Sequence, residues 1–264
     1  QWDIVKQYWL KERKGNSGVA TRDVNQIRDF YELSENDIWI TFYKREMWWC
    51  RASRDIIELE DQTKIRKVIG KWSNKNLKGH RLSIEKIDGR VTKVQGFRGT
   101  ICSFNKQKNY LIDKINGVTS PEVVKAKENK KVLIDSINTL IQGLWWPDFE
   151  LLIDLIFSSA GWQRISVAGK TEKDIDLDLF SPISQKKVFV QIKSKSDIKQ
   201  FEEYINTFNS YKQYDEMYYV VHTSKDNLKG LVEGNDKIHL MDLNRIAELV
   251  VNAGLLNWLI EKRS

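Results

Sequence analysis

The chain has few cysteines, prolines and histidines, and it has no long apolar run. Its two cysteines, Cys50 and Cys102, exclude a disulfide framework and give no support for secretion. No stretch approaches the roughly eighteen uncharged apolar residues that a membrane span needs. Residues 1–10 already carry Asp3 and Lys6 and lack the apolar core of a signal peptide. We therefore expect a cytoplasmic protein without a membrane partner.

Acidic residues are scarce in the first half of the chain. Residues 1–130 hold 27 lysines and arginines against 17 aspartates and glutamates, a net charge of +10. Residues 131–264 hold 16 against 19, a net charge of −3, so the overall +7 conceals an asymmetry. Between residues 64 and 110 the only acids are Glu85 and Asp88. This asymmetry is typical of a polyanion-binding module joined to a second domain; the alternative is a solvated basic surface that favours solubility.

Tryptophan, in contrast, is abundant, with ten residues. Basic residues interleaved with aromatic ones suit nucleic acid, because phosphates attract cations and unstacked bases pack on flat apolar rings. For any single tryptophan, burial in a core is the simpler expectation. Six of the ten lie in the basic half: Trp2, Trp9, Trp39, Trp48, Trp49 and Trp72.

Short strand-like segments follow a lead-in of helical or irregular character at residues 1–33. The polar segment Tyr43–Glu46 separates two apolar runs and predicts a hairpin. Asp88-Gly89 is a strong two-residue hairpin signal. We therefore expect residues 1–120 to form a β-rich, barrel-like domain. The predicted strands are Ile38–Phe42, Met47–Arg51, Arg81–Ile87, Arg90–Val94 and Gly99–Phe104.

A polar connecting helix is expected at residues 121–143. Ser120 can cap it, Pro121 is tolerated at its first position, Glu122 complements the helix dipole, and Gly143 ends it. Residues 144–264 would then form the second domain.

The second domain alternates helices and strands. This order predicts an α/β domain with a mixed sheet covered by helices. Helices are expected at 147–160, 196–211, 228–233 and 243–251, and strands at 162–167, 174–180, 188–193, 217–222 and 237–241.

Acidic residues repeat at every second position in one of these strands. Asp174, Asp176 and Asp178 share a face and would repel one another unless a divalent cation neutralised them. Gln191 and Lys193 share a face of the next strand, which a hairpin can bring beside the aspartates. Carboxylate and amide oxygens can hold Mg²⁺, and a lysine can orient an attacking water. These are the requirements for hydrolysing a phosphodiester.

The segment Asp176…Gln191-Ile192-Lys193 resembles the active-site motif of the PD-(D/E)xK nuclease superfamily in its Gln variant. Residues 145–262 resemble the Mrr-like restriction endonuclease branch of that superfamily. The segments that carry this resemblance are Trp146–Glu150, Gly161-Trp162, Asp174–Leu177, Val188–Lys193, Tyr218–Ser224 and Ile238–Asp242.

The resemblance implies a role for each matching residue. Asp176 would be the metal-binding aspartate, Gln191 the second ligand and Lys193 the catalytic lysine. Glu150 would add an acid from the first helix, and Asp178 could replace Asp176 as the ligand. Mg²⁺ is the implied cofactor, with Mn²⁺ as a substitute. The sequence departs from the family where Lys170–Lys173 stands in place of a glycine-rich run.

The start of the β-rich domain resembles PUA-type folds, including the EVE and SRA-like base readers. Glu35–Ile40 and Trp48–Arg51 carry this resemblance, which implies an aromatic pocket for a flipped base. The candidate stacking residues are Trp39, Tyr43, Trp48, Trp49 and Trp72. The candidate phosphate contacts are Lys64, Arg66, Lys67, Lys71, Lys75, Lys78, Arg81, Arg90, Lys93 and Arg98.

These features together predict a two-domain, Mg²⁺-dependent DNA endonuclease of restriction type. Its partner would be double-stranded DNA, with or without modified bases. Cutting both strands needs two active sites, so a homodimer is expected on DNA. The alternatives are a repair or mobile-element nuclease, a DNA-binding protein with a decayed nuclease core, and an RNA-binding protein built on the first half.

Overall fold

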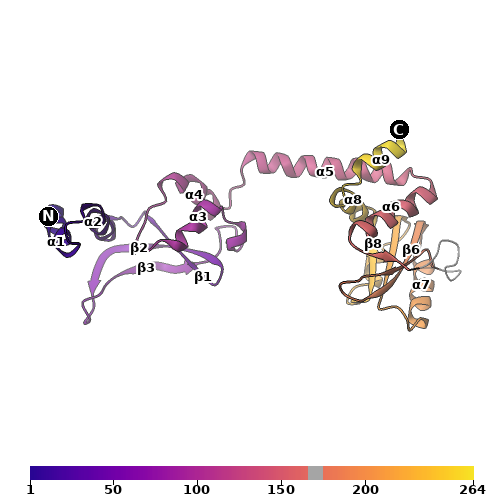
Figure 1. Cartoon of the computed structure of the whole chain (residues 1–264), viewed down its shortest axis with the longest axis horizontal. Coiled ribbons are helices and arrows are strands. Elements are labelled where there is room, and N and C mark those ends of the chain that lie inside the picture. Colours follow the sequence, from indigo (N-terminus) through magenta and orange to yellow (C-terminus); the bar gives the residue numbers. More distant parts are fainter. Residues whose placement is uncertain (166–174) are drawn as a thin grey trace. The chain divides into compact units, whose positions relative to one another are not determined.

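The structure of the chain is a computed structural model, which describes residues 1–165 and 175–264. It divides into two units, Gln1–Val123 and Val124–Ser264 (Figure 1). Each unit is described here by itself. In the described ranges, every helix is too short or too polar to cross a bilayer.

The first unit opens with two helices and continues with a three-stranded sheet and short helices (Figure 1). Asn16 caps the second of these helices by accepting a hydrogen bond from the backbone N–H of Val19. The elements are α1 (Trp2–Glu12), α2 (Ser17–Glu32), β1 (Ile38–Tyr43), β2 (Glu46–Glu58), β3 (Lys64–Ser73), η1 (Ile84–Lys86), α3 (Gly89–Thr92), η2 (Lys93–Gly96), η3 (Asn105–Gln107) and α4 (Lys108–Asn116).

The sheet has the order β1-β2-β3, and both pairs are antiparallel. The predicted hairpin between β1 and β2 is confirmed, and its turn residues Lys44 and Arg45 both have positive φ, as tight hairpin turns require. Val91, Leu111 and Ile115 pack with Met47 against one face of the sheet. β3 was not predicted, because its basic residues interrupt the apolar alternation.

The predicted barrel is wrong. All of residues 1–123 are described, and their three strands form an open sheet whose outer strands, β1 and β3, do not meet. The predicted hairpin at Asp88-Gly89 is also wrong. The Asp88 side chain accepts a hydrogen bond from the backbone N–H of Arg90 and so caps α3. Gly99–Phe104 contains no strand.

The second unit contains a five-stranded mixed sheet with helices on both faces, as predicted. The helix α5 (Pro121–Gln142) leads into it across the boundary between the units. The further elements are α6 (Trp146–Ser159), β4 (Gln163–Arg164), β5 (Leu177–Phe180), β6 (Lys187–Ser196), α7 (Ile198–Ser210), β7 (Glu216–Ser224), η4 (Leu228–Leu231), β8 (Ile238–Met241), α8 (Leu243–Asn252) and α9 (Leu256–Arg263).

The strand order is β4-β5-β6-β7-β8, antiparallel from β4 to β6 and parallel from β6 to β8. The predicted β5–β6 hairpin is confirmed, with Leu177 opposite Val190 and Asp178 opposite Phe189. Because β6 is central and covered on both faces, Val188 to Ile192 are all buried. This strand therefore supplies a rigid base for any side chain that it presents at its end.

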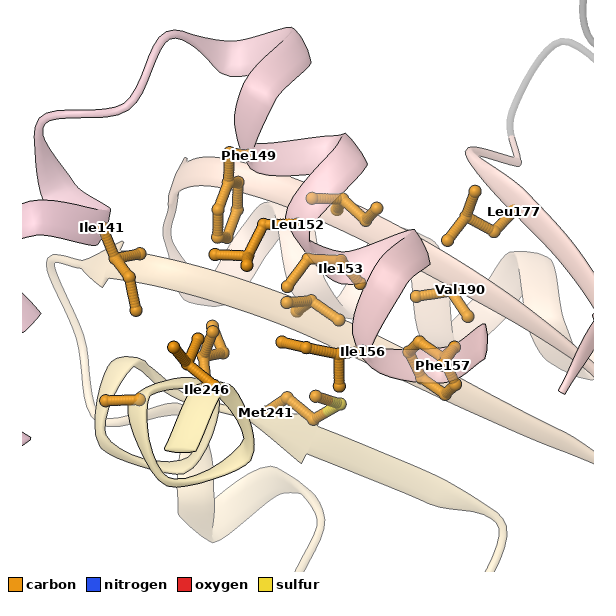
Figure 2. Packing of buried hydrophobic residues seen from close by; sticks show 14 of the residues in the cluster. Ile141, Phe149, Leu152, Ile153, Ile156, Phe157, Leu177, Val190, Met241 and Ile246 are labelled. Carbon is orange, nitrogen blue, oxygen red and sulfur yellow. The ribbon is translucent and has the colours of Figure 1, made fainter. Parts of the chain in front are cut away.

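The two faces of this sheet have separate apolar clusters. On one face Leu152, Ile153 and Phe157 of α6 pack over Leu177 and Val190 of the sheet (Figure 2). The helices α5, α8 and α9 contribute Ile141, Ile246 and Leu259, among others, to the same cluster. On the other face, α7 packs Phe201 and Phe208 against Phe189 and Tyr219. The sheet is thus held between helices on both sides, and its strand ends remain to carry polar residues.

Two sequence predictions fall partly on residues 166–174, which lie outside the described residues. These are the position of Asp174 on the acidic strand face and the departure at Lys170–Lys173. Strand β5 starts at Leu177, later than predicted, and α9 was not predicted at all.

Candidate active site

Asp176 and Gln191 meet at one end of the β5–β6 hairpin. The Asp176 Oδ2 atom accepts two hydrogen bonds of 2.6 Å, from Gln191 Nε2 and from the backbone N–H of Ile192. Gln191 lies on the buried central strand and is only 1% exposed. The carboxylate of Asp176 is therefore anchored to β6 by both a side chain and the backbone. This contact agrees with the prediction that a hairpin brings Gln191 beside the aspartates.

Lys193 and Glu150 complete the group of polar side chains. Burial raises the pKa of Glu150, and the negative charge of Asp176 raises it further, whereas Lys193 and Arg164 act in the opposite direction. Burial also raises the pKa of Asp176, although the Ile192 N–H and the Lys193 charge oppose the shift. The partly buried carboxylates of Glu150 and Asp176 thus both interact with the Lys193 ammonium. The negative charge of the two carboxylates favours a bound cation.

Asp178 lies apart from this group. Its Oδ2 atom is 3.6 Å from Lys187 Nζ, at the opposite end of β6 from Lys193, and its buried Oδ1 atom has no hydrogen-bond partner within residues 1–165 and 175–264. On strand β5 the residue is opposite Phe189 rather than Gln191. The structure thus brings Asp176, and not Asp178, to Gln191.

The residues present fit a divalent metal ion. The Oε1 atom of Gln191 is buried and has no hydrogen-bond partner among the described residues, although such an oxygen normally has one. With the carboxylates of Asp176 and Glu150 it would supply an all-oxygen donor set, the chemistry that Mg²⁺ and Mn²⁺ prefer. Within residues 1–165 and 175–264 no three His, Cys, Asp or Glu side chains group closely enough to form a metal site on their own. A metal ion held here would therefore draw on the amide oxygen of Gln191 as well as on carboxylates.

Sequence reasoning missed Arg164 of β4. Its charge lowers the pKa of Glu150, and its Nη1 atom is 3.9 Å from Asp154 Oδ2. The residue sits in a two-residue edge strand, and its sequence context gave no sign of its position. His222 of β7 is 8% exposed and packs edge-on against Phe149, with a ring-centroid distance of 4.8 Å. Burial, and then the charge of Lys195, lower its pKa.

The five candidate stacking residues of the first unit do not line one pocket. Trp49 packs on the core and donates to Lys75 O, whereas Trp48 points to the other face and donates to Tyr43 O. Tyr43 and Trp72 are exposed. Trp39 packs edge-on against Phe30, and its buried Nε1–H has no acceptor in the part of the chain that the structure describes.

Several predicted phosphate contacts have internal partners. Arg66 donates to Ser53 O at 2.6 Å and to Phe30 O at 3.2 Å, and its guanidinium lies over the Trp39 ring. Its role in the structure is therefore to join β3 to α2 and β2. Three more pair with acids: Lys64 with Glu58, Arg81 with Glu46, and Arg90 with Asp88. The exposed ones that form no ion pair in the described part of the chain are Lys67, Lys71, Lys75, Lys78, Lys93 and Arg98.

A groove of about 1160 Å³ runs through the first unit beside β1. Trp39 is the only one of the five candidate stacking residues that lines it. Sequence reasoning missed the other aromatic lining residues, Phe42, Phe97 and Phe104. Arg28 and Lys108 add positive charge to its wall, and Asp29 and Asp37 add negative charge. The aromatic rings are the groups of this groove on which a base could stack.

Comparison with known proteins bears on the second unit. Residues 141–250 match the Mrr-type catalytic family, whose description is "restriction endonuclease". The comparison with curated proteins and the comparison with solved structures gave no match. The match spans α6, the β5–β6 hairpin and the site at its end, and it gives no support to the PUA-type resemblance of the first unit. Residues 141–250 are therefore similar to the restriction endonuclease catalytic domain of the Mrr type, as their motifs predicted.

Proposed function

We propose that the chain is a Mg²⁺-dependent endonuclease that hydrolyses phosphodiester bonds of double-stranded DNA, in a restriction role. The observation that carries this proposal is the anchoring of Asp176 by Gln191 and Ile192. It supports a preformed site in which Glu150, Asp176 and the free oxygen of Gln191 would hold the metal ion. The Mrr-type family match of the same segment supports the choice of DNA as substrate.

The side chains divide the chemical work. A bound divalent cation supplies a water of lowered pKa and offsets negative charge on the scissile phosphate. The two donors to Asp176 hold its carboxylate in one orientation, so little reorganisation is needed when a ligand arrives. Lys193 donates hydrogen bonds to the attacking water or to a phosphate oxygen. Its positive charge stabilises the negative charge that develops on the phosphate.

The first unit would hold the DNA. The exposed cations Lys67, Lys71 and Lys75 favour phosphate contacts, which position a duplex without reading its sequence. The groove beside β1 is our candidate for base recognition, because aromatic rings line it and one of them, Phe97, is exposed. A flipped base, normal or modified, would be stacked and hydrogen-bonded in such a site.

Two copies of the chain would act together on DNA. One active site hydrolyses one phosphodiester bond, whereas a double-strand break requires two. We therefore propose a homodimer that forms at least on DNA. Sedimentation velocity of the full chain with and without a DNA duplex, in Ca²⁺ to prevent cutting, measures the stoichiometry. A complex with one protein per duplex would contradict the dimer.

The deciding experiment is cleavage of plasmid DNA by the full chain in Mg²⁺, with Asp176→Ala and Lys193→Ala as test variants. We expect both to lose cleavage while retaining DNA binding. Asp178→Asn is the matched control, because Asp178 is two residues away on the same strand but pairs with Lys187. Full activity in either test variant, or loss of activity only in the control, would falsify the site assignment.

The same assay separates the alternatives. Substrates with unmodified, cytosine-methylated and adenine-methylated DNA, followed by sequencing of the ends, distinguish a restriction enzyme with defined sites from a repair or mobile-element nuclease. A decayed nuclease core predicts no metal-dependent nicking of any DNA. An RNA-binding protein predicts that RNA outcompetes DNA for the first unit.

A further inference from the structure

The ammonium group of Lys193 lies over an aromatic ring rather than against a carboxylate. Its Nζ atom is 5.2 Å from the centroid of Tyr204, a residue of α7. Within the described residues, no carboxylate oxygen lies within 4.0 Å of this ammonium. Its charge nevertheless acts on both Glu150 and Asp176. The cation is thus close to two acids without pairing with either.

Tyr204 is itself held by a buried aromatic stack. Its ring is 5.8 Å from that of Tyr219, which stacks on Phe201 at 4.3 Å with an interplanar angle of 28°. Tyr219 is completely buried, and its hydroxyl forms a 2.6 Å hydrogen bond with Ser196 Oγ. On the sheet, Tyr219 is the register partner of Gln191. The ring under Lys193 is therefore held against β7, the strand that pairs with β6 at Gln191.

We propose that Tyr204 is a positioning residue for Lys193 in the cleavage reaction, an inference that rests on the proposed nuclease function. A lysine side chain has four rotatable bonds and would otherwise fold onto a nearby carboxylate. An ion pair of that kind would neutralise the ammonium and block an oxygen that the metal needs. The ring attracts the cation electrostatically while leaving its N–H donors free.

The hydroxyl group of Tyr204 is not needed for this role. It forms no hydrogen bond in the part of the chain that the structure describes. The ring face provides the attraction, and phenylalanine has the same face. Tyr204→Phe is therefore a matched control for Tyr204→Leu, which keeps an apolar side chain of similar length but removes the ring.

The first test is single-turnover cleavage by the full chain in Mg²⁺. A cation–π contact in a partly desolvated site is worth enough to predict a rate about tenfold lower in Tyr204→Leu. Tyr204→Phe should stay within about twofold of the wild type. DNA affinity in Ca²⁺ should be unchanged in both, because Tyr204 acts on the rate and not on binding. Equal rates in the wild type and Tyr204→Leu would overturn the proposal.

The second test does not depend on activity. In NMR spectra of the full chain without DNA or metal, the Lys193 ε-methylene signal should be shifted upfield by the ring. It is assigned by its loss in Lys193→Gln. Tyr204→Leu should remove the shift and Tyr204→Phe should retain it. The chemical-shift dispersion of the other signals in the same spectra shows whether Tyr204→Leu is folded.

The two tests separate this inference from the proposed function. A wild type that cuts DNA but shows no ring-induced shift overturns the role of Tyr204 alone. A wild type that shows the shift but cuts no DNA overturns the nuclease function, and with it the role of Tyr204 in that function.

Discussion

Gln191 donates a 2.6 Å hydrogen bond to Asp176, and among the described residues its own buried carbonyl oxygen has no partner. Asp176 directly precedes β5 and Gln191 lies on β6, so the register of the β5–β6 hairpin places the two side chains together. A neutral amide at this position can approach the aspartate closely without a metal. A carboxylate could not do so without repulsion or a shared proton. The amide therefore allows the site to form before a cation arrives, with one fewer negative charge to bind it.

Gln191→Glu should bind Mn²⁺ about tenfold more tightly than the wild type, because a second carboxylate adds charge to the donor set. Without metal the variant should be less stable, since two carboxylates would be held at hydrogen-bond distance. Isothermal titration with Mn²⁺ measures the first effect, and urea unfolding without metal measures the second.

Gln191→Leu is the control for this pair, because it removes both the amide donor and the free oxygen. It should bind Mn²⁺ more weakly than the wild type. Unchanged Mn²⁺ affinity in both Gln191 variants would show that Gln191 is not a ligand, whatever their stability.

Alanine substitutions of Arg66 and of its neighbour Lys67 should have opposite effects on folding stability and on DNA binding. Arg66→Ala leaves the carbonyl groups of Ser53 and Phe30 without their donor and should cost about 1–3 kcal/mol of folding free energy. Lys67→Ala should leave stability unchanged. It should instead reduce the slope of log affinity for DNA against log salt by about one.

Urea unfolding and DNA binding over a range of salt concentrations distinguish the two variants. The opposite assignment, a salt-slope change in a stable Arg66→Ala, would mean that this guanidinium contacts phosphate and that its internal hydrogen bonds are dispensable.

Sequence patterns predicted the second unit better than the first. Strands β6 and β7 are buried apolar runs, and their length and flanking turns identify them without any tertiary information. In the first unit, the Asp88-Gly89 pair has the composition of a hairpin turn, but aspartate is equally a helix cap. Whether Asp88-Gly89 forms a hairpin turn or a helix cap depends on which residues pack against Val91, and this packing cannot be predicted from the sequence.

In the candidate site, too, local sequence patterns predicted only the contacts that do not depend on tertiary packing. Strand alternation and a hairpin are local rules, so the spacing of Asp176, Gln191 and Lys193 predicted that a hairpin could bring their side chains together. The choice between Asp176 and Asp178 required the register. The contact of Tyr204 with Lys193 required the packing of α7 on the sheet, and in the sequence Tyr204 is one member of an ordinary apolar stripe.

Leu152 and Leu151 are adjacent on α6 but should differ in their effect on stability. Leu152 is fully buried over the sheet, so Leu152→Ala should cost about 2–5 kcal/mol through lost burial and the cavity left behind. Leu151 is 41% exposed, and Leu151→Ala should change stability by less than about 0.5 kcal/mol. Hydrogen–deuterium exchange of β6 peptides in urea reports on the second unit directly. Equal effects of the two substitutions would contradict the orientation of α6.

Glu216 should make the second unit sensitive to acid. Burial alone would raise the pKa of this carboxyl, but hydrogen bonds from Lys186 and His239 outweigh burial and hold it below the ordinary value of 4.5. A carboxyl with a lowered pKa in the folded state stabilises the protein above its unfolded-state pKa, and this stabilisation is lost as the pH falls below about 4.5.

Glu216→Gln should thus be less stable than the wild type by about 1–3 kcal/mol near neutral pH. The difference should shrink as the pH is lowered from about 5 to about 3, because the wild-type carboxyl becomes protonated. Urea unfolding of both proteins across this range measures it, with Glu248→Gln, in an exposed pair with Arg245, as the control. A difference that stays constant with pH would mean that the charge of Glu216 does not contribute, and that only its shape and its hydrogen-bonding capacity matter.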